Sequence, residues 1–148
     1  MSQLSRWSAN LLIWAGSGLV VVSAVVHFHL WESDGYNHIP TIGPLFLMQA
    51  VVGALLAVVT SISRHWLLAL AEAGFAIATL GGFLISVNVG LFGWQDSWAA
   101  PFASLSLGVE VAGAAMLLTA SALLFRPWSS QRGRNRHSLG TPRRARNP

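Results

Sequence analysis

The chain has 148 residues, of which 53% are hydrophobic and only 9% are charged, with a mean hydropathy of +0.55. A soluble domain usually carries roughly a quarter charged residues, so this composition excludes an ordinary globular protein and indicates one that crosses a membrane several times. Cysteine is absent, which excludes disulfides, thiolate metal sites and cysteine nucleophiles. The net charge of +4 comes from arginines that lie mostly after Phe125, an arrangement that favours contact with anionic lipid over nucleic acid.

Four apolar segments predict four membrane-spanning helices and therefore an all-α fold. They cover about 11–30, 45–62, 66–92 and 102–125, and each is long enough, at 1.5 Å per residue, to cross a hydrocarbon layer of about 30 Å. A cleavable signal peptide is the alternative for the first segment, but the apolar run continues past its small-residue site. We therefore predict an antiparallel four-helix transmembrane bundle over 1–128, followed by a disordered basic tail over 129–148.

The arginines also predict the orientation of this bundle. Arg6, Arg64 and the whole C-terminal set fall on one side of the expected membrane, whereas the connections 31–43 and 93–101 contain no basic residue. Cytoplasmic loops of membrane proteins carry the excess of basic residues. We therefore expect a multi-pass protein of the inner (plasma) membrane with both termini in the cytoplasm.

Small residues repeat every four positions on three of the expected helices. Such a stripe flattens one helix face, and another helix can then pack closely against it. The three stripes are Gln49, Gly53 and Ala57; Gly74, Ala78 and Gly82; and Ser104, Gly108 and Ala112.

Polar side chains inside the apolar segments are the candidates for function. His27, Gln49 and Asn88 should lie about 6–9 Å below the outer surface, with Glu110 about 12 Å below it, so one residue from each helix can join a polar cluster. Such groups either bridge helices or form a site for a proton, a metal ion or a polar ligand, and both interpretations stay open. Glu72 is isolated nearer the inner surface, where it suits interhelical bonding or contact with a partner protein.

The histidines near the first connection raise the hypothesis of a metal site. His27, His29, Asp34 and His38 offer four ligands, although the two histidines can bind together only if the helix ends between them. A transmembrane haem is disfavoured, because the only other histidine at a helix end is His65 on the opposite side.

The first hairpin also carries a resemblance. Gly35-Tyr36 and the run Ile39 to Leu47 (IPTIGPLFL), after His29-Leu30-Trp31, resemble small four-helix membrane proteins of actinobacteria that have no assigned activity. A shorter and weaker similarity to the same proteins is GLFG at 90–93. The resemblance implies the four-helix architecture and transfers no functional residue.

The sequence favours a non-enzymatic function, because no catalytic constellation is recognisable in it. The leading prediction is an accessory or scaffold subunit of a larger membrane complex, with lipids and other membrane subunits as partners. The alternative is a carrier or sensor of a proton, a metal ion or a small ligand. A third interpretation is an enzyme that acts on a lipid or a quinone.

Overall fold

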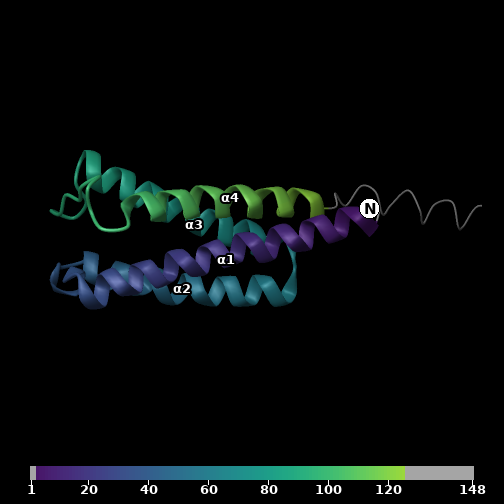
Figure 1. Cartoon of the computed structure of the whole chain (residues 1–148), viewed down its shortest axis with the longest axis horizontal. Coiled ribbons are helices and arrows are strands. Elements are labelled where there is room, and N and C mark those ends of the chain that lie inside the picture. The colour runs from purple at the N-terminus through teal and green to yellow at the C-terminus, as the bar shows by residue number, and fades with distance from the viewer. Residues whose placement is uncertain (1–2, 126–148) are drawn as a thin grey trace, which may run out of the picture.

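A computed structural model describes residues 3–125, which form four α-helices and no strand (Figure 1). The helices are α1 (Gln3–Ser33), α2 (Ile42–Ser63), α3 (Trp66–Asn88) and α4 (Ala103–Leu124), and a short 3-10 helix, η1 (Tyr36–His38), follows α1. Each of the four is long and apolar enough to cross a membrane, which confirms the all-α prediction and its four candidate spans. The predicted tail at 129–148 lies outside the described residues.

The largest differences from the predicted helix boundaries are at the start of α1 and the end of α3, while α1 ends and α2 begins three residues beyond the prediction, at Ser33 and Ile42. The helix α1 begins at Gln3 and extends over 31 residues, because the polar segment before residue 11 is also helical. At 1.5 Å per residue this helix is about 46 Å long, so it projects beyond a hydrocarbon layer of about 30 Å or tilts within it. The helix α3 ends at Asn88, short of the predicted 92, because Gly90 and Phe92 adopt positive φ angles of 89° and 52° that no helix accommodates.

The two longer connections lie together at one end of the bundle, on the left in Figure 1, which we call the loop end. They are residues 34–41, which include η1, and residues 89–102; Tyr36 of the first donates a hydrogen bond to Asp96 of the second. The opposite end, which we call the turn end, holds the short α2–α3 connection. There Trp14 of α1 donates to the carbonyl of Ser61 at 3.4 Å.

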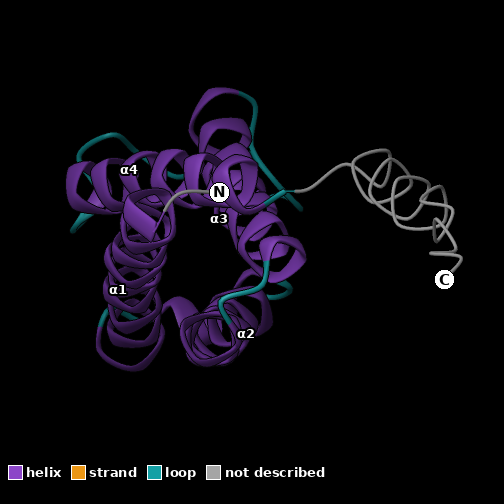
Figure 2. Ribbon diagram, turned by 90° about the vertical axis from the view of Figure 1, so that its right-hand side faces the viewer, coloured by secondary structure: helices purple, strands orange, loops and turns teal. Residues whose placement is uncertain are grey.

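The helices surround a shared interior in which α1 packs against both α2 and α4 (Figure 2). The helices α2 and α3 make the least extensive contact of any pair of neighbours in the ring. The space between them therefore has to be filled by side chains or left open, and this is where the candidate site lies.

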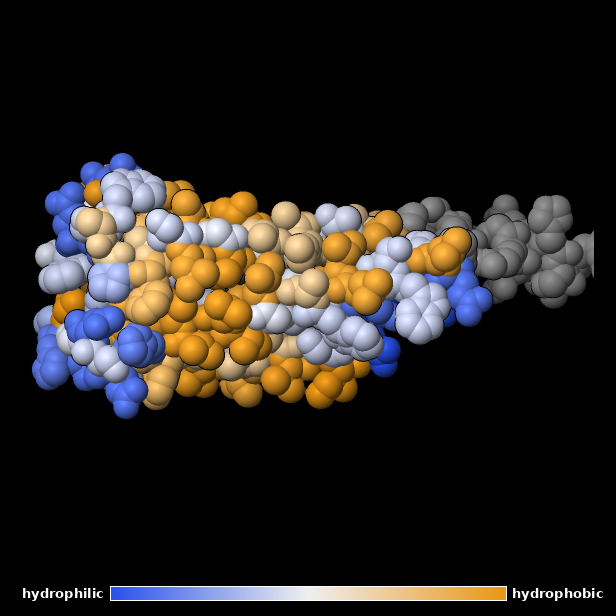
Figure 3. All heavy atoms as spheres, in the orientation of Figure 1, coloured by the Kyte–Doolittle hydropathy of each residue, from blue (hydrophilic) through white to orange (hydrophobic). Residues whose placement is uncertain are grey.

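The polarity of the bundle is inverted relative to a soluble protein. Large apolar side chains such as Leu55 and Ile62 are 61% and 71% exposed, whereas most of the buried residues are alanine, serine or other small or polar types. On the face shown in Figure 3, hydrophobic residues cover the middle of the bundle and hydrophilic ones gather at the loop end. This distribution suits a lipid environment, where small residues allow helices to approach and polar groups bond between them.

The closest helix approach joins α1 to α4 at Gly16 and Gly113. A Cβ on Gly16 would lie 2.8 Å from Leu117 Cγ and 3.2 Å from the Gly113 carbonyl oxygen, so only glycine fits. The predicted stripe at Gln49, Gly53 and Ala57 is buried, which confirms it as a packing face. The other two stripes differ, because a Cβ added at Gly74, Gly82 or Gly108 would meet no packed neighbour within 4 Å.

Candidate functional site

The polar groups of α1 and α4 that the sequence places at one depth form a connected network. Ser23 lies one turn before His27, and its hydroxyl donates to Glu110 Oε1 on α4 at 2.8 Å. The imidazole Nδ1 lies 2.9 Å from the Ser23 carbonyl oxygen and 3.4 Å from its hydroxyl oxygen. His27 and Glu110 are both buried and face the interior, so the structure brings together these two predicted residues through a third.

This network contains the residue types of a hydrolase triad but not their order. A triad needs the histidine between the serine and the acid, so that the imidazole accepts the hydroxyl proton. Here Ser23 stands in the middle and its hydroxyl donates a hydrogen bond to the Glu110 carboxyl, while Nδ1 must donate to a backbone carbonyl. The arrangement therefore does not activate a nucleophile. It fixes the tautomer of His27, and in the neutral ring the free lone pair is at Nε2.

Gln49 of α2 belongs to a second polar pair in the same half of the bundle. Its Oε1 accepts a 2.7 Å hydrogen bond from Thr79 of α3, whose hydroxyl also lies 3.1 Å from the carbonyl oxygen of Phe75. The predicted cluster does not include Asn88. That side chain is exposed and donates to the carbonyl of Leu84 in its own helix at 2.7 Å, so the prediction that it joins the cluster is wrong.

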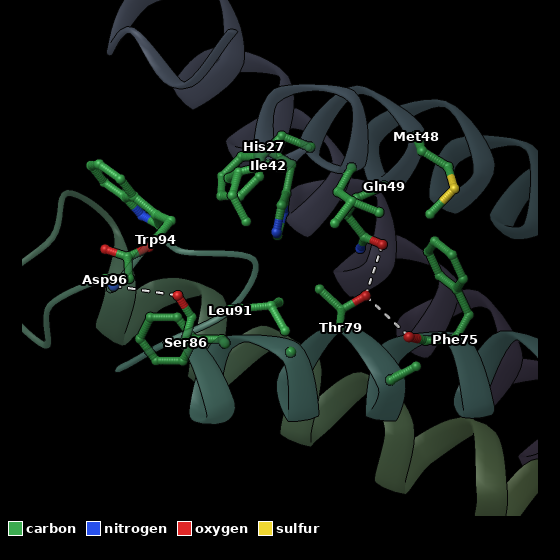
Figure 4. Close-up of a pocket in the computed structure, with 15 residues that line it drawn as sticks. His27, Ile42, Met48, Gln49, Phe75, Thr79, Ser86, Leu91, Trp94 and Asp96 are labelled. Atoms are coloured by element: carbon green, nitrogen blue, oxygen red, sulfur yellow. Dashed lines mark hydrogen bonds between the residues drawn. The ribbon is translucent and has the colours of Figure 1, made fainter. Parts of the chain in front are cut away.

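A cavity of about 230 Å³ separates α2 from α3 at the loop end. Its walls come from α2, α3 and the α3–α4 loop, with His27 of α1 at the back (Figure 4). Four aromatic side chains contribute to the apolar lining, and they are Phe46, Phe75, Phe83 and Trp94; aliphatic side chains, among them Ile42, Leu45, Met48 and Leu91, complete it.

Three polar groups on the cavity wall have unused hydrogen-bonding capacity. The Trp94 indole N–H is buried without a partner among the described residues. Within residues 3–125 no hydrogen bond engages the amide nitrogen of Gln49 or Nε2 of His27. In Figure 4 the ring of His27 and the amide of Gln49 both point into the space between α2 and α3. Of the three, the indole N–H of Trp94 is fully buried, and a buried polar group without a partner costs free energy. The three groups together mark a place where a ligand can bond.

A second, smaller cavity of about 30 Å³ adjoins the first and is more polar. The groups that line it include His27, Tyr36, Asp96, Ser106 and Glu110. A polar void of this size accommodates an ordered water, which needs about 10–15 Å³ and two or more polar partners. Because His27 and Asp96 line both cavities, the second one links the Glu110 carboxyl to the first.

Tyr36 lines the second cavity at the loop end. Its ring stacks on Phe46 with centroids 4.5 Å apart and meets Trp94 edge-on at 6.3 Å. Its hydroxyl donates to the Asp96 carboxylate, with both oxygens at 3.3 Å. Burial, then the charge of Asp96 and the bond to it, raise the pKa of Tyr36 to about 12, with a smaller contribution from Asp34. The phenol therefore stays protonated at physiological pH and ties the two connections together.

Glu72 lies inside the bundle rather than on its surface. It is 0% exposed, and Ser17 of α1 donates to its Oε2 at 2.9 Å. Thr60 of α2 is also fully buried beside it, yet its hydroxyl and Glu72 Oε1 both lack a well-formed hydrogen bond within the described chain. Glu72 therefore bonds within the bundle, as one of its two predicted uses requires, and contact with a partner protein stays a prediction.

The structure does not assemble the predicted metal site. The helix α1 continues to Ser33, so His27 and His29 remain two positions apart on a regular helix and point to nearly opposite sides. His29 packs edge-on against Phe102 at 5.6 Å, while Asp34 and His38 are exposed. In residues 3–125 no three His, Asp or Glu side chains group in a way that could hold a metal ion.

The predicted candidate residues did not include the side chains that complete these networks. Ser23, Ser17 and Thr79 are small hydroxyl residues inside apolar segments, where such residues commonly bond to their own helix backbone. The spacing of Ser23 four residues before His27 was the available signal for the first network. Trp94 gave no such signal, because a tryptophan near a helix end is typical of the membrane interface.

Together these features define a class: an all-helical bundle with four candidate membrane-spanning helices and a partly polar cavity between two of them. Comparison with known protein families, with curated proteins and with solved structures finds no match. The resemblance of the first hairpin to small actinobacterial membrane proteins therefore stays a prediction. The structure gives that segment a physical role, because Gly43 lies so close to η1 that a Cβ would be 2.8 Å from the Tyr36 carbonyl oxygen.

Proposed function

We propose that this chain is a multi-pass protein of the plasma membrane, with four antiparallel crossings and both termini in the cytoplasm. The arginines support this orientation, since Arg6 and Arg64 lie toward the turn end and the loop end has no basic residue between 31 and 43 or between 89 and 102. A reporter that is active only outside the cytoplasm should work when inserted near Gly35 and be silent after Arg64. Activity after Arg64 would overturn the orientation.

Within that membrane, the protein binds a small apolar ligand in the α2–α3 cavity and acts as its carrier or sensor. The observation that carries this proposal is the coincidence of an aromatic cavity with three unused hydrogen-bonding groups. An apolar pocket with a few convergent polar groups is the usual form of a ligand site. The burial of Glu72 weakens the scaffold interpretation, because the strongest candidate contact for a partner protein is not accessible.

Filling the cavity from one wall tests this function. Gly82 lines the cavity and has no atom within 4 Å of a Cβ position, so Gly82→Leu adds a side chain that occupies the ligand space without a backbone clash. Gly74→Leu is the matched control, because Gly74 lies on the same helix and is equally open but does not line the cavity. Both variants replace glycine in α3 by the same side chain, so they share any effect on helix propensity.

The measurement is saturable binding of the fluorescent apolar probe Nile red to the purified protein in detergent micelles. We expect about one site per chain in the wild type and in Gly74→Leu, and loss of that site in Gly82→Leu. Native mass spectrometry should find an apolar molecule that co-purifies with the first two proteins only. Absence of saturable binding together with absence of a co-purified molecule would refute the ligand function.

A second candidate function is the accessory subunit, and one observation favours it. The stripe formed by Ser104, Gly108 and Ala112 on α4 meets no other helix at Gly108, where a Cβ would have open space. A helix of another membrane protein can pack on such a face. Gly108→Leu should then abolish co-purification of that protein in mild detergent while Nile red binding is retained.

A further inference from the structure

We propose that the α2–α3 cavity binds the ring of a quinone or quinol, an inference that rests on the ligand function above. The shape and lining of the cavity supply the first argument. Four aromatic rings surround a volume of about 230 Å³, whereas roughly 150 Å³ is enough to hold a benzene molecule. Aromatic walls favour a flat ring, which they contact in stacked and edge-on arrangements, over a flexible acyl chain.

The unused hydrogen-bonding groups supply the second argument. The amide nitrogen of Gln49 and the indole N–H of Trp94 are donors, and a quinone offers two ring carbonyls that accept such bonds. His27 offers the opposite capacity, because its Nδ1 must donate to Ser23 and the neutral ring then accepts at Nε2. A quinol hydroxyl donates to that nitrogen. The cavity thus presents partners for both the oxidised and the reduced form of the same ring.

The charge of the lining disfavours lipids with an anionic headgroup. No arginine lines the cavity within residues 3–125, and the sequence has no lysine, so a phosphate or carboxylate headgroup would meet no permanent cation there. Asp96 on the wall would repel such an anion. An uncharged head with carbonyl or hydroxyl oxygens satisfies the donors without this repulsion.

The cavity has an opening on the outside of the bundle, and the position of this opening indicates how such a molecule enters. Met48 of α2 and Ala78 of α3 line the cavity and are exposed, so they mark its edge on the outside of the bundle. Counted from the loop end of each helix, they lie about 9 Å and 15 Å into the spans. Both depths are within the hydrocarbon layer. A ring that enters there leaves an isoprenoid tail in the lipid beside Gly82.

Displacement of Nile red from the wild-type protein tests the ligand class without any substitution. The competitors are a short-tailed benzoquinone, a short-tailed naphthoquinone and their reduced forms, compared with an acyclic isoprenoid alcohol and a fatty acid of similar carbon number. We expect the quinones and quinols to displace the probe at concentrations at least tenfold lower than the alcohol or the acid. Displacement by the alcohol or the acid at equal or lower concentrations would overturn the quinone assignment and leave the ligand function intact.

Three variants then test the assigned contacts. Gln49→Leu removes the amide donor and should weaken quinone binding roughly 3- to 10-fold, the effect expected for one hydrogen bond. Thr79→Val is its control, because it breaks the same Gln49–Thr79 bond but keeps the donor, and it should change affinity less than about twofold. Equal losses in the two variants would show that packing, not the donor, determines binding.

His27→Phe keeps a ring beside Phe46, whose centroid lies 5.0 Å from that of His27, but removes the acceptor. It should reduce affinity for the quinol several-fold more than affinity for the quinone. Equal effects on both forms, or none on either, would contradict the role of Nε2. If Nile red shows no saturable site and no apolar molecule co-purifies, the ligand function itself fails and the quinone assignment falls with it.

Discussion

The bond between Tyr36 and Asp96 makes a quantitative prediction for a single substitution, Asp96→Asn. The change removes a negative charge next to the phenol and replaces a carboxylate acceptor by an amide of the same shape. Burial is the largest cause of the raised pKa of Tyr36, and the carboxylate contributes the next two effects. We therefore expect the pKa in Asp96→Asn to fall below about 12 while remaining above 10.0, because burial and Asp34 still act.

The raised pKa of Tyr36 also makes the stability of the folded chain depend on pH. Whether stability rises or falls with pH follows from which state, folded or unfolded, loses the phenol proton first. Below pH 10 the folded and unfolded chains both keep the phenol proton, so the full stability is present. Between pH 10 and 12 the unfolded chain loses the proton first, so stability falls as the pH rises. A pKa difference of two corresponds to about 2.7 kcal/mol, which partial solvent screening at the loop end reduces to about 1–2 kcal/mol.

The chain suits a direct measurement of this titration. Tyr36 is the only tyrosine, and the sequence has no lysine or cysteine that would ionise in the same range. Near-ultraviolet absorbance of tyrosinate therefore reports one residue without isotope labelling. Asp34→Asn is the matched control and should lower the midpoint less, since the Asp34 charge is the smallest cause. An unchanged or higher midpoint in Asp96→Asn would refute the assigned bond.

Three further substitutions test the interior of the bundle by thermal unfolding in detergent. Gly16→Val forces a clash at the α1–α4 contact and should cost about 1–3 kcal/mol, whereas Gly18→Val, with open space around it, should cost far less. Thr60→Val removes a buried hydroxyl without a partner and should be neutral or stabilise by up to about 1 kcal/mol; a loss would reveal a bond to Glu72. Glu110→Gln keeps an acceptor for Ser23, so stability should change by less than about 1 kcal/mol, whereas any pH dependence of ligand binding should weaken.

The architecture was predictable because composition constrains it strongly. Apolar segments of about 20 residues leave few alternatives to helices that cross a membrane, and the four candidate spans are confirmed. The ends of α1 and α3 were less predictable, because a polar helical segment and a turn with positive φ do not alter mean hydropathy. Boundaries depend on local backbone geometry, and apolar length does not encode it.

The candidate site was predictable only where the position of a residue along its helix determines which side chains can come into contact. Helix rise placed His27 and Glu110 at similar levels, and the structure joins them through Ser23. Depth does not determine which way a side chain faces, and Asn88 consequently lies outside the cluster. The cavity was not predictable at all, because it follows from the incomplete contact between α2 and α3, and no single residue signals that contact.

The pairing of α1 with helices made much later has a consequence for biosynthesis. Ser17 and Ser23 bond to carboxyls that follow them by 55 and 87 positions, and the Gly16–Gly113 contact joins the first helix to the last. At roughly 5–20 residues per second, the ribosome needs about 4–17 s to supply Glu110 after Ser23. During that interval the Ser23 hydroxyl lies in the membrane without its Glu110 partner. The contacts between the first and the fourth helix therefore form only after the last span has been made, and the bundle closes at that point.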